Sequence, residues 1–188
     1  MAVNLRQSYM SDQALFLLVE DNADDVMLIR RAFQKSRVLN PLHVAQTGEE
    51  AVAYLSGEGR YRNRTEFPLP ALVLLDLKMP GMDGFDVLKW VREQPGLSLL
   101  RVVVLTSSDS MRDVNLAYQL GANSFLVKPV DFDRFVEISQ ALSGYWLWLD
   151  RAPDIARPQE LPLPRKVPLP QAPPYYSSTH PPKRPDAP

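Results

Sequence analysis

Chemically reactive side chains stand at the ends of four short aliphatic stretches of this sequence. Glu20 and Asp21 follow FLLV, Asp76 follows ALVLL, Thr106 ends RVVVLT and Lys128 ends SFLVK. If these stretches are parallel strands, their carboxyl ends meet at one edge of a sheet. Each residue alone is explained as a solvated strand end or a surface group, but their occurrence together favours a functional site.

The chemistry of such a site follows from its charges. Three neighbouring carboxylates raise one another's pKa values unless a cation lies among them, and oxygen ligands at a partly open site suit Mg²⁺. A carboxylate can also act as a nucleophile and form an aspartyl phosphate. Phosphoryl transfer then needs positioning and charge neutralisation, which a metal ion, a lysine and a hydroxyl group supply.

The elements that position these residues are predicted from hydrophobic runs and caps. We predict strands over 16–20, 41–45, 71–76, 101–106 and 124–128, and helices from Asn22, over 49–55, over 84–93, over 110–120, and from Asp131 toward Trp148. The strands are continuously aliphatic, which is typical of a parallel sheet covered on both faces. The predicted fold is therefore α/β, with a doubly wound five-stranded parallel sheet, and the polar stretch 56–70 is a connection.

Composition excludes several classes of protein. The chain has 188 residues, 45% of them hydrophobic, a formal net charge of −1, no cysteine and two histidines. Disulfide frameworks, thiolate chemistry and cysteine-based metal sites are excluded, and no broad attraction to nucleic acid or anionic lipid is expected. With no signal pattern and no run long enough to cross a membrane, a cytoplasmic protein is expected.

Proline marks the predicted domain boundary. Of the 18 prolines, 12 lie between Pro153 and Pro188. We predict an N-terminal arm over 1–13, a globular domain over 14–150 and a Pro-rich tail over 151–188. Such a tail favours extended or disordered chain over a packed core, and a spacer is favoured over a PxxP peptide ligand.

Four motifs, VEDNADD, LLDLKMPGMDG, VLTSS and FLVKP, occur in order over about Phe16–Trp148. In type and spacing they resemble the signature segments of response-regulator receiver domains of two-component signalling, which have the flavodoxin-like (βα)5 fold. The resemblance implies a protein that accepts a phosphoryl group from a sensor histidine kinase and is not an enzyme acting on other substrates. It also implies roles for single residues. Asp76 would be the phosphoacceptor, and Thr106 and Lys128 would be partners of the phosphoryl group. Asp21 would be a direct Mg²⁺ ligand, the Lys78 carbonyl a further ligand, and Glu20 would act through metal-bound water.

Three positions near this pattern carry further expectations. Phe125 occupies the aromatic switch position, where many family members have tyrosine, so coupling to Thr106 remains possible without a phenolic hydrogen bond. The family usually has a cis peptide bond before the proline that is Pro129 here. The Lys78 ammonium group either approaches the phosphoryl group and alters its lifetime, or is a surface group that contributes only its carbonyl; both alternatives stay open.

The expected partners follow from the C-terminal part of the chain. The segment after Trp148 is too proline-rich for a DNA-binding or catalytic output domain, so a stand-alone receiver is expected. Tyr145, Trp146 and Trp148 crowd the end of the last helix and predict an exposed partner surface, unless the tail folds over it. The chain also resembles small phytochrome-associated response regulators, which implies a phytochrome-type kinase and a homodimer through the fourth helix, fifth strand and fifth helix (110–120, 124–128 and 131–148).

Three alternative functions agree less well with the sequence. An aspartate-nucleophile phosphatase should have a second acid two residues after the nucleophile, but that position is Lys78. A flavin-binding protein should have a glycine- and hydroxyl-rich loop after the first strand rather than EDNADD. A receiver-like module that binds partners without phosphorylation is disfavoured because every expected site position is occupied.

Overall fold

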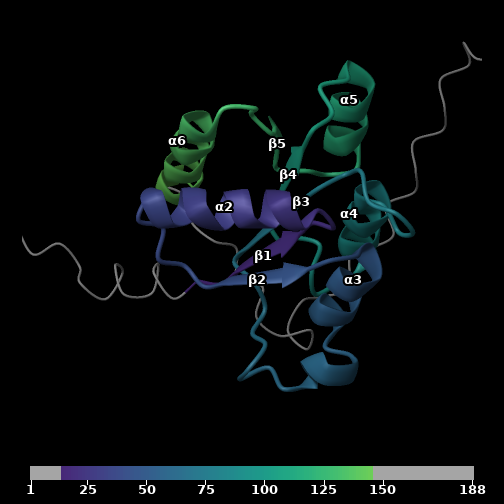
Figure 1. The fold of residues 1–188 in the computed structure, drawn as a ribbon. Coiled ribbons are helices and arrows are strands. Elements are labelled where there is room, and N and C mark those ends of the chain that lie inside the picture. The colour runs from purple at the N-terminus through teal and green to yellow at the C-terminus, as the bar shows by residue number, and fades with distance from the viewer. Residues whose placement is uncertain (1–13, 146–188) are drawn as a thin grey trace, which may run out of the picture. The chain divides into compact units, whose positions relative to one another are not determined.

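The computed structural model of the protein describes residues 14–145 (Figure 1). In chain order its elements are β1 Phe16–Val19, α2 Ala23–Lys35, β2 Leu42–Ala45, α3 Gly48–Ser56, η1 Gly59–Arg62, β3 Leu72–Leu75, α4 Gly84–Glu93, β4 Val102–Thr106, α5 Met111–Gln119, β5 Ser124–Val127 and α6 Phe132–Ser143. The predicted strands and helices are confirmed. The last helix was predicted to run toward Trp148, and the part beyond Tyr145 lies outside the described residues.

The strands form one parallel sheet in the order β2-β1-β3-β4-β5. On β1, Leu18 lies opposite Val44 of β2 on one side and Leu74 of β3 on the other. The chain builds outward from β1 in one direction and then from β3 in the other, so the topology is doubly wound, as predicted. In such sheets the crevice for ligands lies beyond the carboxyl ends of the two strands where the winding direction changes. Here these strands are β1 and β3.

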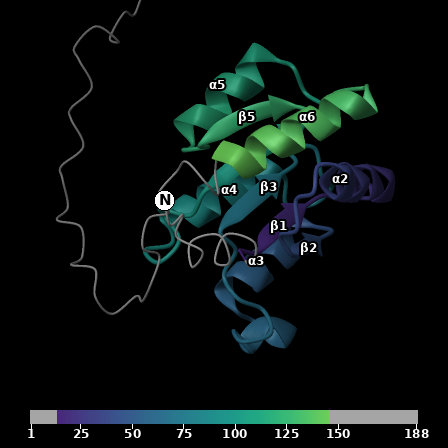
Figure 2. The same ribbon diagram turned by 90° about the vertical axis from the view of Figure 1, so that its left-hand side faces the viewer.

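Helices cover both faces of the sheet, with α2 and α6 on one face and α3, α4 and α5 on the other (Figures 1 and 2). Phe16 of β1 packs with Ile29 of α2 and Phe135 of α6, and all three side chains are almost completely buried. On the opposite face Leu75 belongs to a second cluster with Leu88 of α4. Burial on both faces explains why the strands are continuously aliphatic.

Side-chain caps begin α2, α3, α4 and α6 at the carboxyl edge of the sheet, and two of them are those predicted from the sequence. The Asn22 side chain accepts hydrogen bonds from the backbone N–H groups of Asp24 and Asp25 at 2.9 and 3.3 Å. The Asp131 side chain accepts one from the N–H of Asp133 at 2.7 Å. Both caps were predicted, and they fix the starting points of α2 and α6 beside the strand ends.

The connection between α3 and β3 is anchored more firmly than its polar sequence indicates. It contains η1, whose Tyr61 is buried against the rings of Tyr54 and His43, at centroid separations of 5.0 and 5.7 Å. Arg64 donates a hydrogen bond from Nη1 to the Tyr54 carbonyl at 2.7 Å, within the last turn of α3. These contacts join the connection to β2 and to the last turn of α3, so they depend on the fold and no local pattern reveals them.

Three sequence expectations fall wholly or partly outside the described residues. These are the N-terminal arm 1–13, the tail 151–188, and the side chains of Trp146 and Trp148. Within the described range, no helix combines the length and the apolar character needed to span a membrane.

Candidate functional site

Three carboxylates meet at the carboxyl edge of the sheet. Glu20 and Asp21 follow β1 and Asp76 follows β3, and one oxygen atom from each lies within 4.8 Å of those of the other two. Glu20 and Asp76 are buried, at 1% and 4% exposure, whereas Asp21 is exposed. The sequence prediction that the ends of β1 and β3 converge is therefore correct in its geometry.

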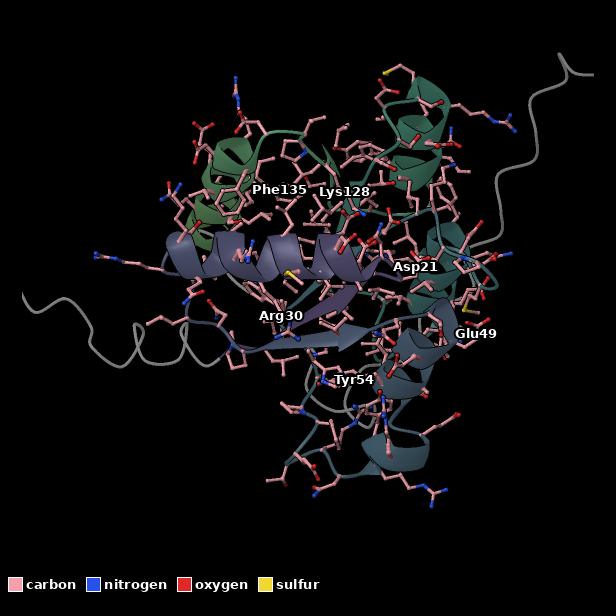
Figure 3. All side chains as sticks on the ribbon, viewed as in Figure 1. Asp21, Arg30, Glu49, Tyr54, Lys128 and Phe135 are labelled. Atoms are coloured by element: carbon pink, nitrogen blue, oxygen red, sulfur yellow. The ribbon has the colours of Figure 1, made fainter. Side chains whose placement is uncertain are left out.

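Lys128, directly after β5, places its ammonium group among these acids. Its Nζ atom lies 2.6 Å from Glu20 Oε2, 2.8 Å from Asp25 Oδ2 and 3.6 Å from Asp76 Oδ1, and its side chain is 8% exposed. Figure 3 shows Asp21 and Lys128 at the same end of the sheet, where α2 begins. The lysine thus neutralises part of the negative charge that the three strand ends bring together.

Burial has opposite consequences for the two partners of this ion pair. Burial raises the pKa of Glu20 to about 7, against the lowering effect of Lys128. Burial alone would lower the pKa of Lys128, but hydrogen bonds to Asp25 and Glu20 and the charge of Asp76 raise it above its usual value. The lysine is therefore charged at neutral pH, and Glu20 is poised to gain or lose a proton there.

Asp76 retains an unused acceptor. Its Oδ1 atom is buried and has no hydrogen-bond partner among the described residues, and the Lys128 contact at 3.6 Å is longer than a hydrogen bond. A buried carboxylate oxygen without a donor is costly. Because Glu20 and Asp21 offer oxygen atoms beside it, the donor set fits a hard divalent cation.

Thr106 ends β4 beside this cluster and is completely buried. Its hydroxyl oxygen accepts a long hydrogen bond from the Ser108 N–H at 3.4 Å, and its carbonyl accepts one from the Lys128 N–H at 2.7 Å. Phe125 lies on the neighbouring strand, opposite Val104 in register, and is half-buried. The hydroxyl and the aromatic ring therefore occupy adjacent strands, as the sequence predicted.

The turn between β3 and α4 is held against the Asp76 backbone. A Cβ atom on Gly84 would lie 2.1 Å from the Asp76 carbonyl oxygen and 2.7 Å from Leu77 Cα, so no side chain fits there. Gly81 has φ +76°, a left-handed conformation that favours glycine. The next residue, Met82, donates its N–H to Glu49 Oε1 at 3.0 Å. These contacts fix the turn that carries the Lys78 carbonyl.

The Lys78 ammonium group, left open by the sequence, pairs with a residue of α5. Its Nζ atom lies 3.0 Å from Asp113 Oδ2. The same oxygen accepts a hydrogen bond from the Ser108 hydroxyl at 2.6 Å. This contact joins the turn after β3 to the loop after β4.

Sequence reasoning missed the roles of Asp25 and Asp113. Asp25 was explained by the dipole of the following helix, yet it also pairs with Lys128. Asp113 was not singled out, and its position in the first turn of α5 was the available signal. Both are acids near helix N-termini, and only the fold shows which of them reach a lysine.

Two further expectations have different outcomes. Tyr145 is 54% exposed, as expected for a surface residue. The peptide bond before Pro129 is trans, because the described residues contain no cis bond, so the family-based expectation of a cis bond is not met. The two isomers of an X–Pro bond differ little in energy, which explains why the residue type alone does not fix the isomer.

Comparison with known proteins identifies the family to which this geometry corresponds. Residues 16–140 match the response regulator receiver domain family. The chain is 37% identical over 145 residues to the probable methanogenesis regulatory protein FilR2 of Methanothrix harundinacea, covering 76% of this chain and 89% of that protein. It is 34% identical over 142 residues to the response regulator Rcp1 of Synechocystis, covering 73% and 95%.

Solved structures agree with this result. The phosphorylated cyanobacterial phytochrome response regulator RcpA superimposes with a TM-score of 0.69 at 34% identity, covering 75% of this chain and 99% of that one. The Mn²⁺-bound form of Rcp1 superimposes with a TM-score of 0.67, covering 74% and 99%. The similar proteins therefore include a phosphorylated form and a metal-bound form of the same fold.

Proposed function

Because the chain belongs to the response regulator receiver domain family of two-component signalling, we propose that it accepts a phosphoryl group on Asp76 from a sensor histidine kinase. The observation that carries the proposal is the buried Asp76 Oδ1 atom, which has no hydrogen-bond partner among the described residues and lies beside Glu20, Asp21 and the Lys128 ammonium group. A nucleophile, a set of oxygen ligands and a cation lie together where the topology predicts a ligand crevice.

The step is a transfer between two covalent phosphoryl compounds. A bond forms between an Asp76 carboxylate oxygen and phosphorus while the P–N bond of phosphohistidine breaks, and the imidazole leaves with the electron pair. Lys128 neutralises charge on the phosphoryl oxygens. To reach them, its ammonium group must weaken its contacts with Glu20 and Asp25. Thr106 donates its hydroxyl to the same group, and Phe125 fills the space that the threonine side chain leaves. The aspartyl phosphate is later hydrolysed, so the protein turns over only its own modification.

The divalent ion of the site is Mg²⁺ in this proposal. Asp21, Asp76 and the Lys78 carbonyl would hold it, with Glu20 acting through water. When bound, the ion supplies charge neutralisation for the transferring phosphoryl group. The Mn²⁺-bound form of the related Rcp1 supports a divalent ion in this fold.

In this proposal the receiver region extends over 14–150, between the arm 1–13 and the tail 151–188.

Phosphorylation acts by changing the contacts that the receiver region makes with other protein chains. Exposed large apolar side chains occur on the α5–β5–α6 face, meaning the surface of these elements, the loop before α6 and Tyr145 just after α6. Among the described residues it carries Met111, Leu116, Tyr118, Val127, Val130 and Tyr145. Such a patch marks an interaction surface, and we propose that it forms a homodimer.

The similarity to RcpA supports a phytochrome-type kinase as the partner that supplies the phosphoryl group.

Intact-mass spectrometry with Mg²⁺ and acetyl phosphate tests the phosphoacceptor. Wild type is expected to gain the mass of one phosphoryl group, Asp76→Asn none, and Asp109→Asn, which changes an exposed acid of the nearby loop, the same as wild type. An unmodified wild-type protein, or an equally modified Asp76→Asn, would contradict the proposal. Candidate kinases are then compared by phosphoryl transfer to the same protein.

Size-exclusion chromatography tests the proposed dimer surface. Tyr118 and Met27 are similarly exposed, at 51% and 53%, but Met27 lies on α2. Tyr118→Lys is expected to weaken association of the phosphorylated protein and Met27→Lys to leave it unchanged. Equal effects of the two substitutions would remove the α5–β5–α6 face from the proposal without affecting the phosphoacceptor.

A further inference from the structure

A second polar cluster lies outside the acidic site and joins the two loops that carry its key residues. We call it the Lys78–Asp113–Ser108 cluster. Asp113 Oδ2 lies 3.0 Å from Lys78 Nζ and accepts a hydrogen bond from Ser108 Oγ at 2.6 Å. Asp113 thus links the turn after Asp76 to the loop after Thr106.

Asp113 is well suited to linking these two segments because its side chain is largely buried and carries a charge. Its side chain is only 15% exposed, whereas that of Lys78 is 55% exposed, so the acid is the fixed partner and the lysine the movable one. The Ser108 hydroxyl and then the Lys78 ammonium group hold the pKa of Asp113 below its usual value. The side chain is therefore an anion at neutral pH.

The cluster is connected to the switch threonine through Ser108. The Ser108 N–H donates to Thr106 Oγ1 at 3.4 Å, while the Ser108 hydroxyl donates to Asp113. A reorientation of the Thr106 hydroxyl therefore changes the environment of Ser108, and with it one of the two contacts that Asp113 makes. Lys78 lies two residues after Asp76, and a phosphoryl group on Asp76 would offer its flexible side chain a second anionic partner.

We propose that Asp113 is a positioning residue that holds the Lys78 ammonium group away from the phosphoryl group and thereby sets the phosphoryl lifetime. The inference rests on the proposed phosphorylation of Asp76. Hydrolysis requires water to approach the phosphorus atom, and an ammonium group resting on the phosphoryl oxygens occupies that approach. A restrained Lys78 therefore keeps hydrolysis fast, and a released Lys78 slows it.

The test compares rates of phosphoryl loss after the phosphodonor is removed, measured by intact mass in full-length protein. Asp113→Asn removes the charge that holds Lys78 but keeps an acceptor for Ser108. We expect its decay to be slower than that of wild type by about fivefold or more, a size typical of coupled charged neighbours. In the double variant Lys78→Ala/Asp113→Asn the decay should return to within about twofold of Lys78→Ala alone.

Controls separate positioning from a general loss of structure. Asp109→Asn, in the loop that carries Ser108 but outside the cluster, should lose its phosphoryl group at the wild-type rate. Urea midpoints show whether each variant is folded. If Asp113 had only a structural role, its substitution would change the decay rate even when Lys78 is also replaced. Such persistence, or a decay rate of Asp113→Asn close to that of wild type, overturns the inference.

The two proposals fail in different ways. If wild type takes up no phosphoryl group at Asp76, the proposed function fails. If wild type is phosphorylated and decays normally while Asp113→Asn decays at the same rate, only the role of Asp113 fails.

Discussion

Lys128 is the residue on which the charge balance of the acidic site depends. It is buried and contacts Glu20, Asp25 and Asp76. Removing one partner of a buried ion pair is more costly than its net contribution suggests, because the remaining charge stays buried without compensation. Glu20, with its pKa near 7, moderates this cost by taking up a proton.

Lys128→Met is therefore expected to lower the free energy of unfolding by about 3 kcal/mol without metal at pH 8, where Glu20 of the wild-type protein is mostly ionised. Saturating Mg²⁺ should reduce the deficit, because a bound cation replaces part of the lost positive charge. Urea denaturation with and without the metal measures both effects. Lys35→Met is the matched control, since the Lys35–Asp133 pair is exposed, and it should cost less than about 1 kcal/mol. A Lys128→Met variant as stable as Lys35→Met would show that the buried charges are compensated in another way.

At the scale of single elements, the sequence predicted the strands, the helices and the strand-end residues because these depend on local rules. Aliphatic runs predict buried strands, and Asn22 and Asp131 predict helix starts. Parallel topology then brings the strand ends to one edge. Contacts between side chains of distant elements, such as Lys78 with Asp113, follow no local pattern because each partner's direction is set by packing elsewhere.

The connection before β3 shows the same limit. Its glycines, prolines and charges predicted an irregular connection, and the structure instead shows a short 3-10 helix with Tyr61 buried and Arg64 bound to α3 carbonyls. Here a small number of contacts with α3 and β2 outweighs the local polarity. Asp25 is a similar case, because its pairing with Lys128 depends on a contact between distant parts of the chain, whereas its favourable interaction with the helix dipole is local.

The turn that begins α4 gives a prediction at this scale. Gly84→Ala places a methyl group 2.1 Å from the Asp76 carbonyl oxygen, so the backbone that presents Asp76 must move. We expect a loss of about 2 kcal/mol in the free energy of unfolding and a marked fall in phosphoryl uptake. Gly144→Ala is the control, because its Cβ atom would meet nothing within 4 Å and its backbone is helical, at φ −61° and ψ −45°. Urea denaturation and intact mass measure the two effects, and normal phosphoryl uptake by Gly84→Ala would contradict the role given to this close approach.

At the scale of the whole molecule, the half-buried His43 and the buried Glu20 give opposite dependences of stability on pH. Burial lowers the pKa of His43, so the unfolded chain binds a proton more readily, and the stability present above the unfolded pKa of 6.5 is lost as pH falls. Burial raises the pKa of Glu20 from 4.5 to about 7, so the stability present below 4.5 is lost as pH rises toward 7. The net profile between pH 5 and 7 therefore conceals both contributions, and a substitution is needed to separate them.

His43→Phe isolates the histidine contribution because Glu20 is unchanged. The ring of His43 lies 4.6 Å from that of Tyr54 and 6.0 Å from that of Phe67, and phenylalanine can keep this packing without a titrating nitrogen. The stability of wild type relative to His43→Phe should rise between pH 5 and 7.5, by at most about 1.4 kcal/mol per pH unit, the limit for one proton. Urea denaturation across this range measures the difference.

Phe67→Leu is the control, since it disturbs the same aromatic cluster without changing a titrating group and should shift stability equally at every pH. If the difference between wild type and His43→Phe is also constant with pH, His43 takes up its proton equally in the folded and unfolded chains, and the acid sensitivity of the fold has another source.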